Sequence, residues 1–182
     1  KSLIPDYLTP MAGYGARNGA NYEGIHDSIW VRAVVFDNGK TISAYVSMDL
    51  LIVPPSLKLD KISENLGIDI NNIFFTASHT HSSIGGYLEG LAGNIFGGKY
   101  DQNNLDFITS KTIEAINEAI KDLKKSKIGF GSIYAADFIT NRLVGDSIGT
   151  HDPFLRVTKI IRDDGKKASI FSYSAHATCF GH

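Results

Sequence analysis

Two histidines separated by a single threonine, His79 and His81, are the residues whose type and spacing most directly indicate chemistry. They follow the apolar run at residues 72–78, which predicts a buried strand. Alternate side chains of an extended strand point to the same face, so we expect the two imidazoles to project together from the strand end. Two imidazoles on one face can hold a metal ion such as zinc. The alternative is a pair of histidines satisfied by loop backbone groups.

A further histidine, His176, follows a similar apolar run at residues 168–174. If both runs are strands of one sheet, their ends bring His79, His81 and His176 to the same edge of that sheet. Catalytic zinc generally has three protein ligands and one open position for water. The repeated pattern of an apolar run, small polar residues and a histidine therefore favours a metal centre over separately capped histidines.

Other polar residues at predicted strand ends and in loops are candidates for supporting roles. Asp49 ends an apolar run, where its carboxylate either orients a ligand histidine or caps the following loop. Arg142 lies in a loop after a predicted strand, and beside a metal it could stabilise a developing oxyanion. His26 and His151 lie in loop or turn sequences, for which a structural role is the simpler interpretation.

The elements that must position these residues predict an α/β fold, with a mixed β-sheet flanked by helices. Helices are predicted at 56–66, with Ser56 as N-cap and Gly67 as its end, and at 105–123, where apolar residues recur at helical spacing. Strands are predicted at residues 29–36, 41–50, 72–78, 127–134, 154–162 and 168–174. The turn sequences at 37–40 and 163–166 make hairpins of the first two strands and of the last two. We expect a single domain over residues 1–182, with at least one parallel crossover.

The segments without periodicity are expected to be loops. Residues 1–28 are rich in glycine, proline, asparagine and tyrosine, and they predict an extended entry to the domain. Residues 82–103 predict a long loop directly after the histidine pair. Long loops inside a folded domain are usually functional or disordered, and this one lies beside the candidate chemistry.

Composition excludes some classes of partner. The chain has 18 basic and 19 acidic residues and a net charge of -1, which gives no electrostatic footprint for nucleic acid. No apolar run is long enough to span a membrane. Cys179 is the single cysteine, so no intrachain disulfide can form, and we expect it to behave as a small buried hydrophobe.

In their order along the chain, these segments resemble the N-terminal catalytic region of the neutral/alkaline non-lysosomal ceramidases. The most specific match is Ala77-Ser78-His79-Thr80-His81-Ser82, with Gly85-Gly86 after it. No single motif is sufficient, but the ordered set is specific and covers nearly the whole chain. The other matching segments are Met11-Ala12-Gly13-Tyr14-Gly15, Gly24-Ile25-His26, Trp30-Val31-Arg32-Ala33, Met48-Asp49-Leu50, Asn141-Arg142, Asp152-Pro153 and Ala175-His176-Ala177-Thr178.

The resemblance implies a zinc-dependent hydrolase that cleaves the amide bond of N-acyl-sphingosine (ceramide) into sphingosine and a fatty acid. It implies that His79 and His176 bind Zn²⁺. It also implies that His81 and Arg142 surround the scissile amide and bind its oxygen or the head group. His26 and Asp49 are expected nearby in supporting roles. The implied partner is a lipid-like small molecule, with association at a membrane surface and an extracellular or periplasmic location.

The chain departs from the family pattern in two respects. The zinc sites of this family are completed by a glutamate and a tyrosine much further along the chain, so we expect residues 1–182 to be an incomplete piece of a larger catalytic domain. With the remaining catalytic segment missing, we expect weak zinc binding and little or no hydrolysis by these residues alone. In addition, Ser83-Ile84 replaces the usual Gly-Pro step, which leaves the acyl substrate open.

Several alternatives remain at this point. The chain could be a metal-dependent hydrolase of another amide or ester. Amidohydrolases also use a His-x-His pair, but they need a full barrel, for which this chain is too short. Metallo-β-lactamase-like enzymes extend the pattern to His-x-His-x-Asp-His, and Ser83 and Ile84 stand in the last two places here. A non-catalytic binding or structural domain would hold its histidines by capping alone, and metal analysis separates it from the enzymes.

Overall fold

The structure, a computed structural model, describes residues 1–176 and residue 178. The described residues fall into two units, residues 1–123 with residue 178 (the first unit) and residues 124–176 (the second unit). The prediction of a single domain over the whole chain therefore stays a prediction. Ala177, which belongs to the second histidine motif, and Cys179, which is expected to be buried, lie outside the described residues.

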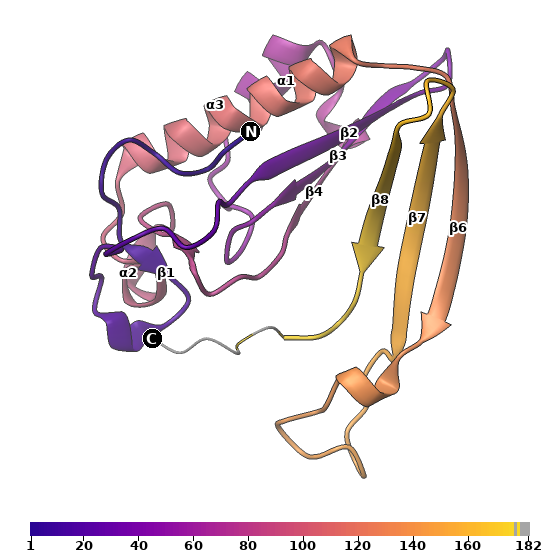
Figure 1. Cartoon of the computed structure of the whole chain (residues 1–182). Coiled ribbons are helices and arrows are strands. Elements are labelled where there is room, and N and C mark those ends of the chain that lie inside the picture. The colour runs from indigo at the N-terminus through magenta and orange to yellow at the C-terminus, as the bar shows by residue number, and fades with distance from the viewer. Residues whose placement is uncertain (177, 179–182) are drawn as a thin grey trace. The chain divides into compact units, whose positions relative to one another are not determined.

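A mixed sheet lies at the centre of the first unit (Figure 1). Strand β2 (Val31–Asp37) pairs antiparallel with β3 (Ile42–Met48), which pairs parallel with β4 (Ile73–Ala77). Side chains close the hairpin turn between β2 and β3, because the amides of Gly39 and Lys40 donate to Asp37 and Asn38 at 2.7 and 2.9 Å. The predicted α/β class, hairpin and parallel crossover are confirmed.

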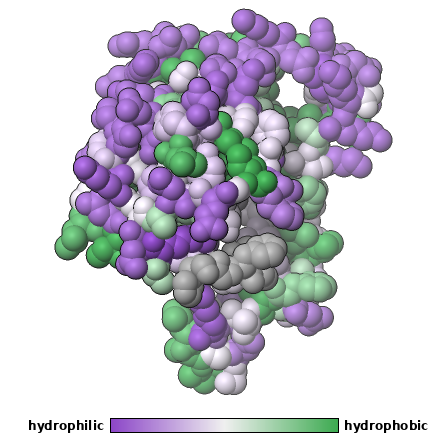
Figure 2. Space-filling model, turned by 60° about the vertical axis from the view of Figure 1, so that its left-hand side comes forward, coloured by the Kyte–Doolittle hydropathy of each residue, from purple (hydrophilic) through white to green (hydrophobic). Residues whose placement is uncertain are grey.

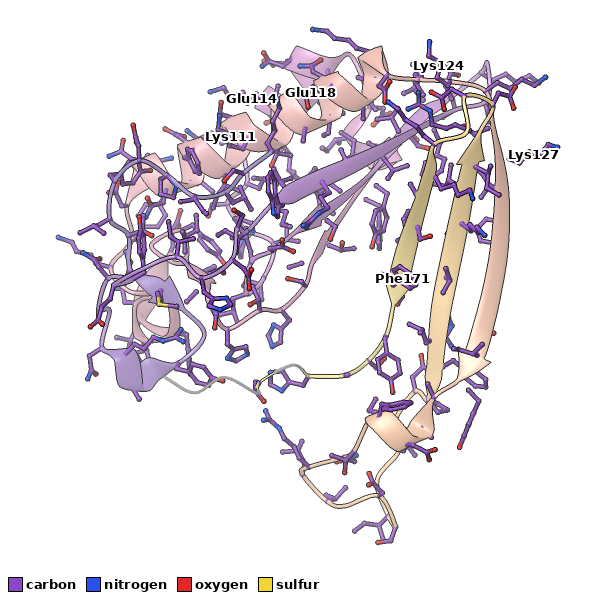
Figure 3. The ribbon with its side chains drawn as sticks, in the orientation of Figure 1. Lys111, Glu114, Glu118, Lys124, Lys127 and Phe171 are labelled. Atoms are coloured by element: carbon purple, nitrogen blue, oxygen red, sulfur yellow. The ribbon has the colours of Figure 1, made fainter. Side chains whose placement is uncertain are left out.

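Helices α1 (Leu59–Leu66) and α3 (Gln102–Lys121) cover one face of this sheet (Figure 1). The apolar residues of α3 pack inward, and its charged residues face solvent, where Lys111 pairs with Glu114 at 2.9 Å (Figure 3). No helix in the described part of the chain is both long and apolar enough to cross a membrane. The fully buried core residues of the sheet and of these helices are Val31, Val46, Met48, Ile62, Ile108 and Ile116.

The start of α1 differs from the prediction that Ser56 is its N-cap. The helix begins at Leu59, and its N-cap position is Lys58, whose side chain makes no capping bond. The preceding residues form a turn instead, which the amide of Leu57 closes by donating to the carbonyl of Pro54 at 3.0 Å. The end of the helix is as predicted, because Gly67 takes the left-handed conformation with φ of +63°.

The prediction of a long loop over residues 82–103 is wrong. This segment contains β5 (Ser83–Ile84), which pairs with β1 (Met11–Ala12), and the helix α2 (Gly90–Gly97). The three glycines of α2 give it a low intrinsic helix propensity, which is why the sequence predicts a loop. Close packing offsets this propensity: a Cβ on Gly93 would stand 2.5 Å from the carbonyl oxygen of Leu88.

The second unit is an antiparallel meander of β6 (Ser126–Tyr134), β7 (Phe154–Arg162) and β8 (Lys167–Ser172). The short helical turn η3 (Ala136–Phe138) and a long loop connect β6 to β7. These strands pair with one another and not with β4. The prediction that His79 and His176 leave the same edge of one sheet is therefore wrong, because each histidine follows a strand of a different sheet.

The sheet of the second unit carries apolar side chains that are exposed to solvent. Every residue of β6 is exposed, and Phe130 keeps 82% of its surface accessible. Phe171 on β8, which Figure 3 labels, is 63% exposed. Apolar groups also interrupt the hydrophilic surface on the face of the molecule drawn in Figure 2.

Candidate functional site

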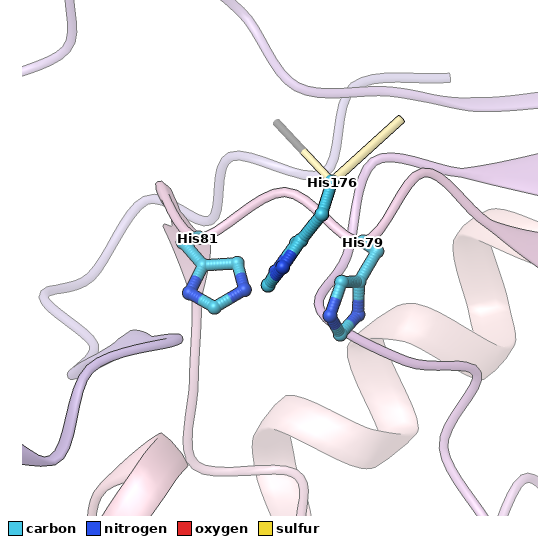
Figure 4. Close-up of side chains that lie close together, drawn as sticks. All are labelled: His79, His81 and His176. Carbon is cyan, nitrogen blue, oxygen red and sulfur yellow. The ribbon is translucent and has the colours of Figure 1, made fainter. Parts of the chain in front are cut away.

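The loop of residues 78–82 (the histidine loop) begins where β4 ends and carries both histidines. The amide of Ser78 makes the last ladder bond, to the carbonyl of Met48 at 2.9 Å. His79 then turns into the left-handed region with φ of +58°, so the extended alternation that predicted a shared face does not apply. The loop still brings the two rings together, since the centroids of His79 and His81 lie 5.0 Å apart with the rings nearly perpendicular (Figure 4).

A backbone carbonyl orients the ring of His79. Its Nδ1 lies 2.7 Å from the carbonyl oxygen of Leu51. A carbonyl can only accept, so Nδ1 carries the proton and Nε2 carries the lone pair in this pairing. An imidazole held at Nδ1 by a carbonyl is the usual arrangement of a metal-binding histidine. The residues present therefore fit a metal ion that accepts nitrogen ligands, such as zinc.

A cavity of about 590 Å³ opens beside His81 in the first unit. It is formed by the entry segment, the end of β3 and the histidine loop. Three of the residues predicted for the site, His26, Asp49 and His81, line this one cavity although they are far apart in the sequence. The rest of its wall is mainly apolar and includes Ile4, Met11, Ile25, Ile29 and Ile84.

Asp49 and His26 have polar partners at the cavity wall. Oδ2 of Asp49 accepts hydrogen bonds from Nη1 of Arg32 at 2.8 Å and from the amide of Trp30 at 3.0 Å. Nδ1 of His26 lies 2.8 Å from Oδ2 of Asp27, and both of these side chains are exposed. Asp49 thus ties the end of β3 to β2, and its role in orienting a histidine stays a prediction.

A second cavity, of about 410 Å³, opens beside His79. Most of its lining is apolar and comes from α2 and from the segment after β3: Leu51, Ile52, Pro55, Leu88, Ala92, Gly93 and Phe96. Tyr87, which precedes this lining, is fully buried, and burial raises the pKa of its hydroxyl to about 12. The phenol therefore stays neutral at physiological pH and adds no charge near the cavity. The histidine pair thus lines one apolar cavity on each side.

Arg142 and His176 belong to the second unit. Arg142 is exposed in the loop between η3 and β7. Its neighbour Asn141 organises this loop, because its amide donates to Asp146 at 2.6 Å and its side chain donates to the carbonyl of Thr150 at 3.1 Å. The hydrogen bonds from Asn141 and Thr140 lower the pKa of Asp146. His176 is exposed and follows the end of β8 at Ser172.

Sequence reasoning missed the residues that hold His81. Tyr14 and Arg17 lie against its ring and its backbone, and Gly13 leaves the space for it. Gly13 and Tyr14 belong to a matching segment, but nothing in that segment indicated a contact with the histidine loop. The signal that could have found Arg17 is its charge, since it stands alone as a cation between residues 2 and 31.

Residues 6–144 match the family described as neutral/alkaline non-lysosomal ceramidase, N-terminal. The chain belongs to this family. The match includes the histidine loop, Arg142 and all residues that line the two cavities except Ile4. The resemblance inferred from the ordered motifs is thereby confirmed.

Solved ceramidase structures share the fold of this family member. A structure described as "Ceramidase complexed with C2" is similar with a TM-score of 0.81 and 21% sequence identity, over 97% of this chain and 30% of that chain. The neutral ceramidase from Pseudomonas aeruginosa is similar with a TM-score of 0.80 and 21% identity, over 97% of this chain and 31% of that chain. The chain thus spans about 30% of the length of these structures.

Proposed function

We propose that this chain provides the N-terminal part of the active site of a zinc-dependent hydrolase that cleaves the amide bond of ceramide. Family membership supports the reaction class. The observation that carries the proposal is the histidine pair: His79 is held at Nδ1 by a backbone carbonyl, and each histidine lines an apolar cavity. A polar centre between two apolar cavities suits an amide that joins two hydrocarbon chains.

His79 and His176 are the proposed metal ligands. Figure 4 labels both of them together with His81, and imidazole nitrogens are ligands that zinc accepts. Zinc bound by such nitrogens supplies Lewis acidity toward an amide carbonyl and toward water. Leu51 contributes its carbonyl, which keeps the proton of His79 on Nδ1.

His81 and Arg142 are proposed to bind the reacting amide. Both side chains offer N–H donors, and donors aimed at the oxygen that gains charge lower the barrier of acyl transfer. His26 and Asp49 have supporting roles in this proposal, since both line the cavity beside His81. Asp49 contributes by accepting hydrogen bonds from the amide of Trp30 and from Arg32, which fix its carboxylate.

One hydrocarbon chain of the substrate is proposed to enter the cavity beside His79. Filling this cavity should therefore penalise long chains selectively. We expect Ala92→Phe to raise KM roughly 10-fold or more for a ceramide with a long acyl or sphingoid chain, because each methylene kept in water costs about 0.8 kcal/mol. Two substrates with the same sphingoid base, one N-acetylated and one N-hexadecanoylated, show which of the two hydrocarbon chains occupies the cavity.

The control for this prediction is Leu59→Phe, because Leu59 of α1 is 41% exposed and lines neither of the two cavities. A rise in KM for the N-hexadecanoyl substrate alone would assign the cavity to the acyl chain. An equal rise in KM for both substrates would assign it to the sphingoid chain. Unchanged KM values for both substrates with Ala92→Phe would remove the cavity from the proposal.

Contact with a lipid surface also belongs to this proposal. Leu91, Ile95 and Phe96 of α2 are exposed beside the cavity of His79, and such apolar groups can enter a lipid interface. We propose an extracellular or periplasmic location for the protein. Sedimentation with ceramide-containing vesicles tests the lipid contact, and Leu91→Asp is expected to weaken vesicle binding. Fractionation of the native cells tests the location. Equal sedimentation of the variant and the unaltered protein would contradict the lipid contact. Recovery of the protein in the cytosolic fraction would contradict the proposed location.

The function is tested with the natural protein at its full length. Zinc content is measured by mass spectrometry, and sphingosine released from N-acyl-sphingosines is measured with and without a chelator. We expect about one zinc per chain and a release of sphingosine that the chelator abolishes and added zinc restores. If the protein binds zinc but releases no sphingosine from any ceramide, ceramide is not its substrate. A zinc-dependent hydrolase of another amide or ester would then be the remaining function. Absence of both bound zinc and sphingosine release would overturn the proposal.

A further inference from the structure

Arg17 contacts the backbone of His81, although 64 residues separate them in the sequence. Its Nη1 donates hydrogen bonds to the carbonyl oxygens of His81 at 2.6 Å and of Ala12 at 2.9 Å. The guanidinium is half-buried, and this burial lowers its pKa, but an arginine remains charged at neutral pH. Charge-assisted bonds of this kind are about twice as strong as neutral ones. Arg17 therefore fastens the histidine loop to the entry segment.

Tyr14 connects the same guanidinium with the ring of His81. Cζ of Arg17 lies 4.8 Å from the centroid of the Tyr14 ring, which is within the range of a cation–π contact. The Tyr14 ring in turn lies 4.8 Å from the imidazole of His81, with the two planes inclined by 55°. The three side chains thus form a stack in which Tyr14 is the middle layer.

Gly13 allows this close approach. Its φ is +123°, a conformation that side-chain-bearing residues rarely adopt. A Cβ at this position would stand 2.6 Å from Cα and Cβ of His81 and 2.8 Å from Cγ. The amide of Gly13 donates to the carbonyl of Phe96 at 2.7 Å, which fixes the segment on α2. The entry segment therefore supports His81 at its backbone, its Cβ and its ring.

We infer that Arg17 is a positioning residue, which holds the backbone of His81 directly and its imidazole through Tyr14 in the orientation required for amide hydrolysis. The inference rests on the role proposed above for His81. His79 is held separately, by the carbonyl of Leu51. Loss of Arg17 should therefore disturb His81 and leave metal binding by His79 in place.

The test compares Arg17→Met and Arg17→Lys in the natural protein at its full length. Arg17→Met is expected to lower kcat for ceramide hydrolysis by roughly 10- to 100-fold, because a displacement of about 1 Å of a reacting group costs on that order. The zinc content should stay unchanged. Arg17→Lys should recover part of the loss, because an ammonium can still donate to one of the two carbonyls. Arg156→Met is the control, since Arg156 also lies over an aromatic ring, that of Phe154 at 5.7 Å, in the second unit.

A second measurement does not depend on activity. Imidazole ¹H–¹⁵N spectra at one fixed pH should show that Arg17→Met shifts or broadens the signals of His81 and leaves those of His79 in place. Unchanged signals of His81 would overturn the inference. A change in the signals of both histidines together with loss of bound zinc would also overturn the inference, because Arg17 would then only stabilise the fold. If the unaltered protein does not hydrolyse ceramide, the proposed function fails, and these spectra still decide the positioning of His81.

Discussion

Replacement of His79 by asparagine is expected to weaken zinc binding by a factor on the order of 100 or more. Even loss of a residue that only supports a metal ligand costs 10- to 100-fold in affinity, so loss of the ligand itself should cost at least as much. Asparagine suits this position because His79 has a φ of +58°, and asparagine is among the residues that tolerate this backbone region. The zinc dissociation constant is measured by competition with a chromophoric chelator.

The matched control for this prediction is His151→Asn in the second unit. His151 lies in the loop before β7, and no role in metal binding is assigned to it. Its replacement should leave the zinc dissociation constant within about a factor of two, and circular dichroism should show that both variants are folded. If the His79 variant is folded and still binds zinc as tightly as the unaltered protein, His79 is not a ligand.

Replacement of Gly85 by alanine is expected to destabilise the first unit by about 1–3 kcal/mol, the cost of overpacking a close contact. A Cβ on Gly85 would stand 2.1 Å from the carbonyl oxygen of Gly97, so the end of α2 would have to move. The neighbouring amide of Gly86 donates to that carbonyl at 2.6 Å, and the movement would strain this bond. Urea unfolding followed by the fluorescence of Trp30, the single tryptophan, reports on the first unit.

Gly24→Ala is the control for this substitution. Gly24 also lies in the first unit, and no heavy atom lies within 4 Å of a Cβ built there. Its replacement should change the free energy of unfolding by less than about 0.5 kcal/mol, as is usual for open surface positions. Equal stability of the two variants would show that β5 and α2 are not packed as closely as described.

The elements that depend on local sequence were predictable. The turn residues Asp37–Lys40 closed a hairpin as expected, because their side chains bond the turn amides. Helix α3 followed from its apolar spacing, and Gly67 ended α1 because glycine adopts a positive φ at little cost. These features form through interactions between residues a few positions apart, so they can be predicted from the local sequence pattern.

The features that depend on distant contacts were not predictable. Helix α2 forms despite its glycines because Gly85 and Gly93 allow close packing that propensity does not describe. The division of strands between two sheets depends on which edges pair, and apolar runs do not encode this choice. The histidine pair follows the end of a strand as predicted, but His79 reaches its place through a left-handed turn and a bond to Leu51.

The proposed function depends above all on His79 as a ligand of a zinc ion. Anomalous diffraction from crystals of the natural full-length protein with zinc, recorded on both sides of the zinc absorption edge, tests it most directly. We expect one strong peak at about 2.0–2.1 Å from Nε2 of His79, the usual zinc–nitrogen distance, with Nδ1 still bonded to Leu51. A zinc peak elsewhere, or no peak near His79 with zinc in excess, would contradict it.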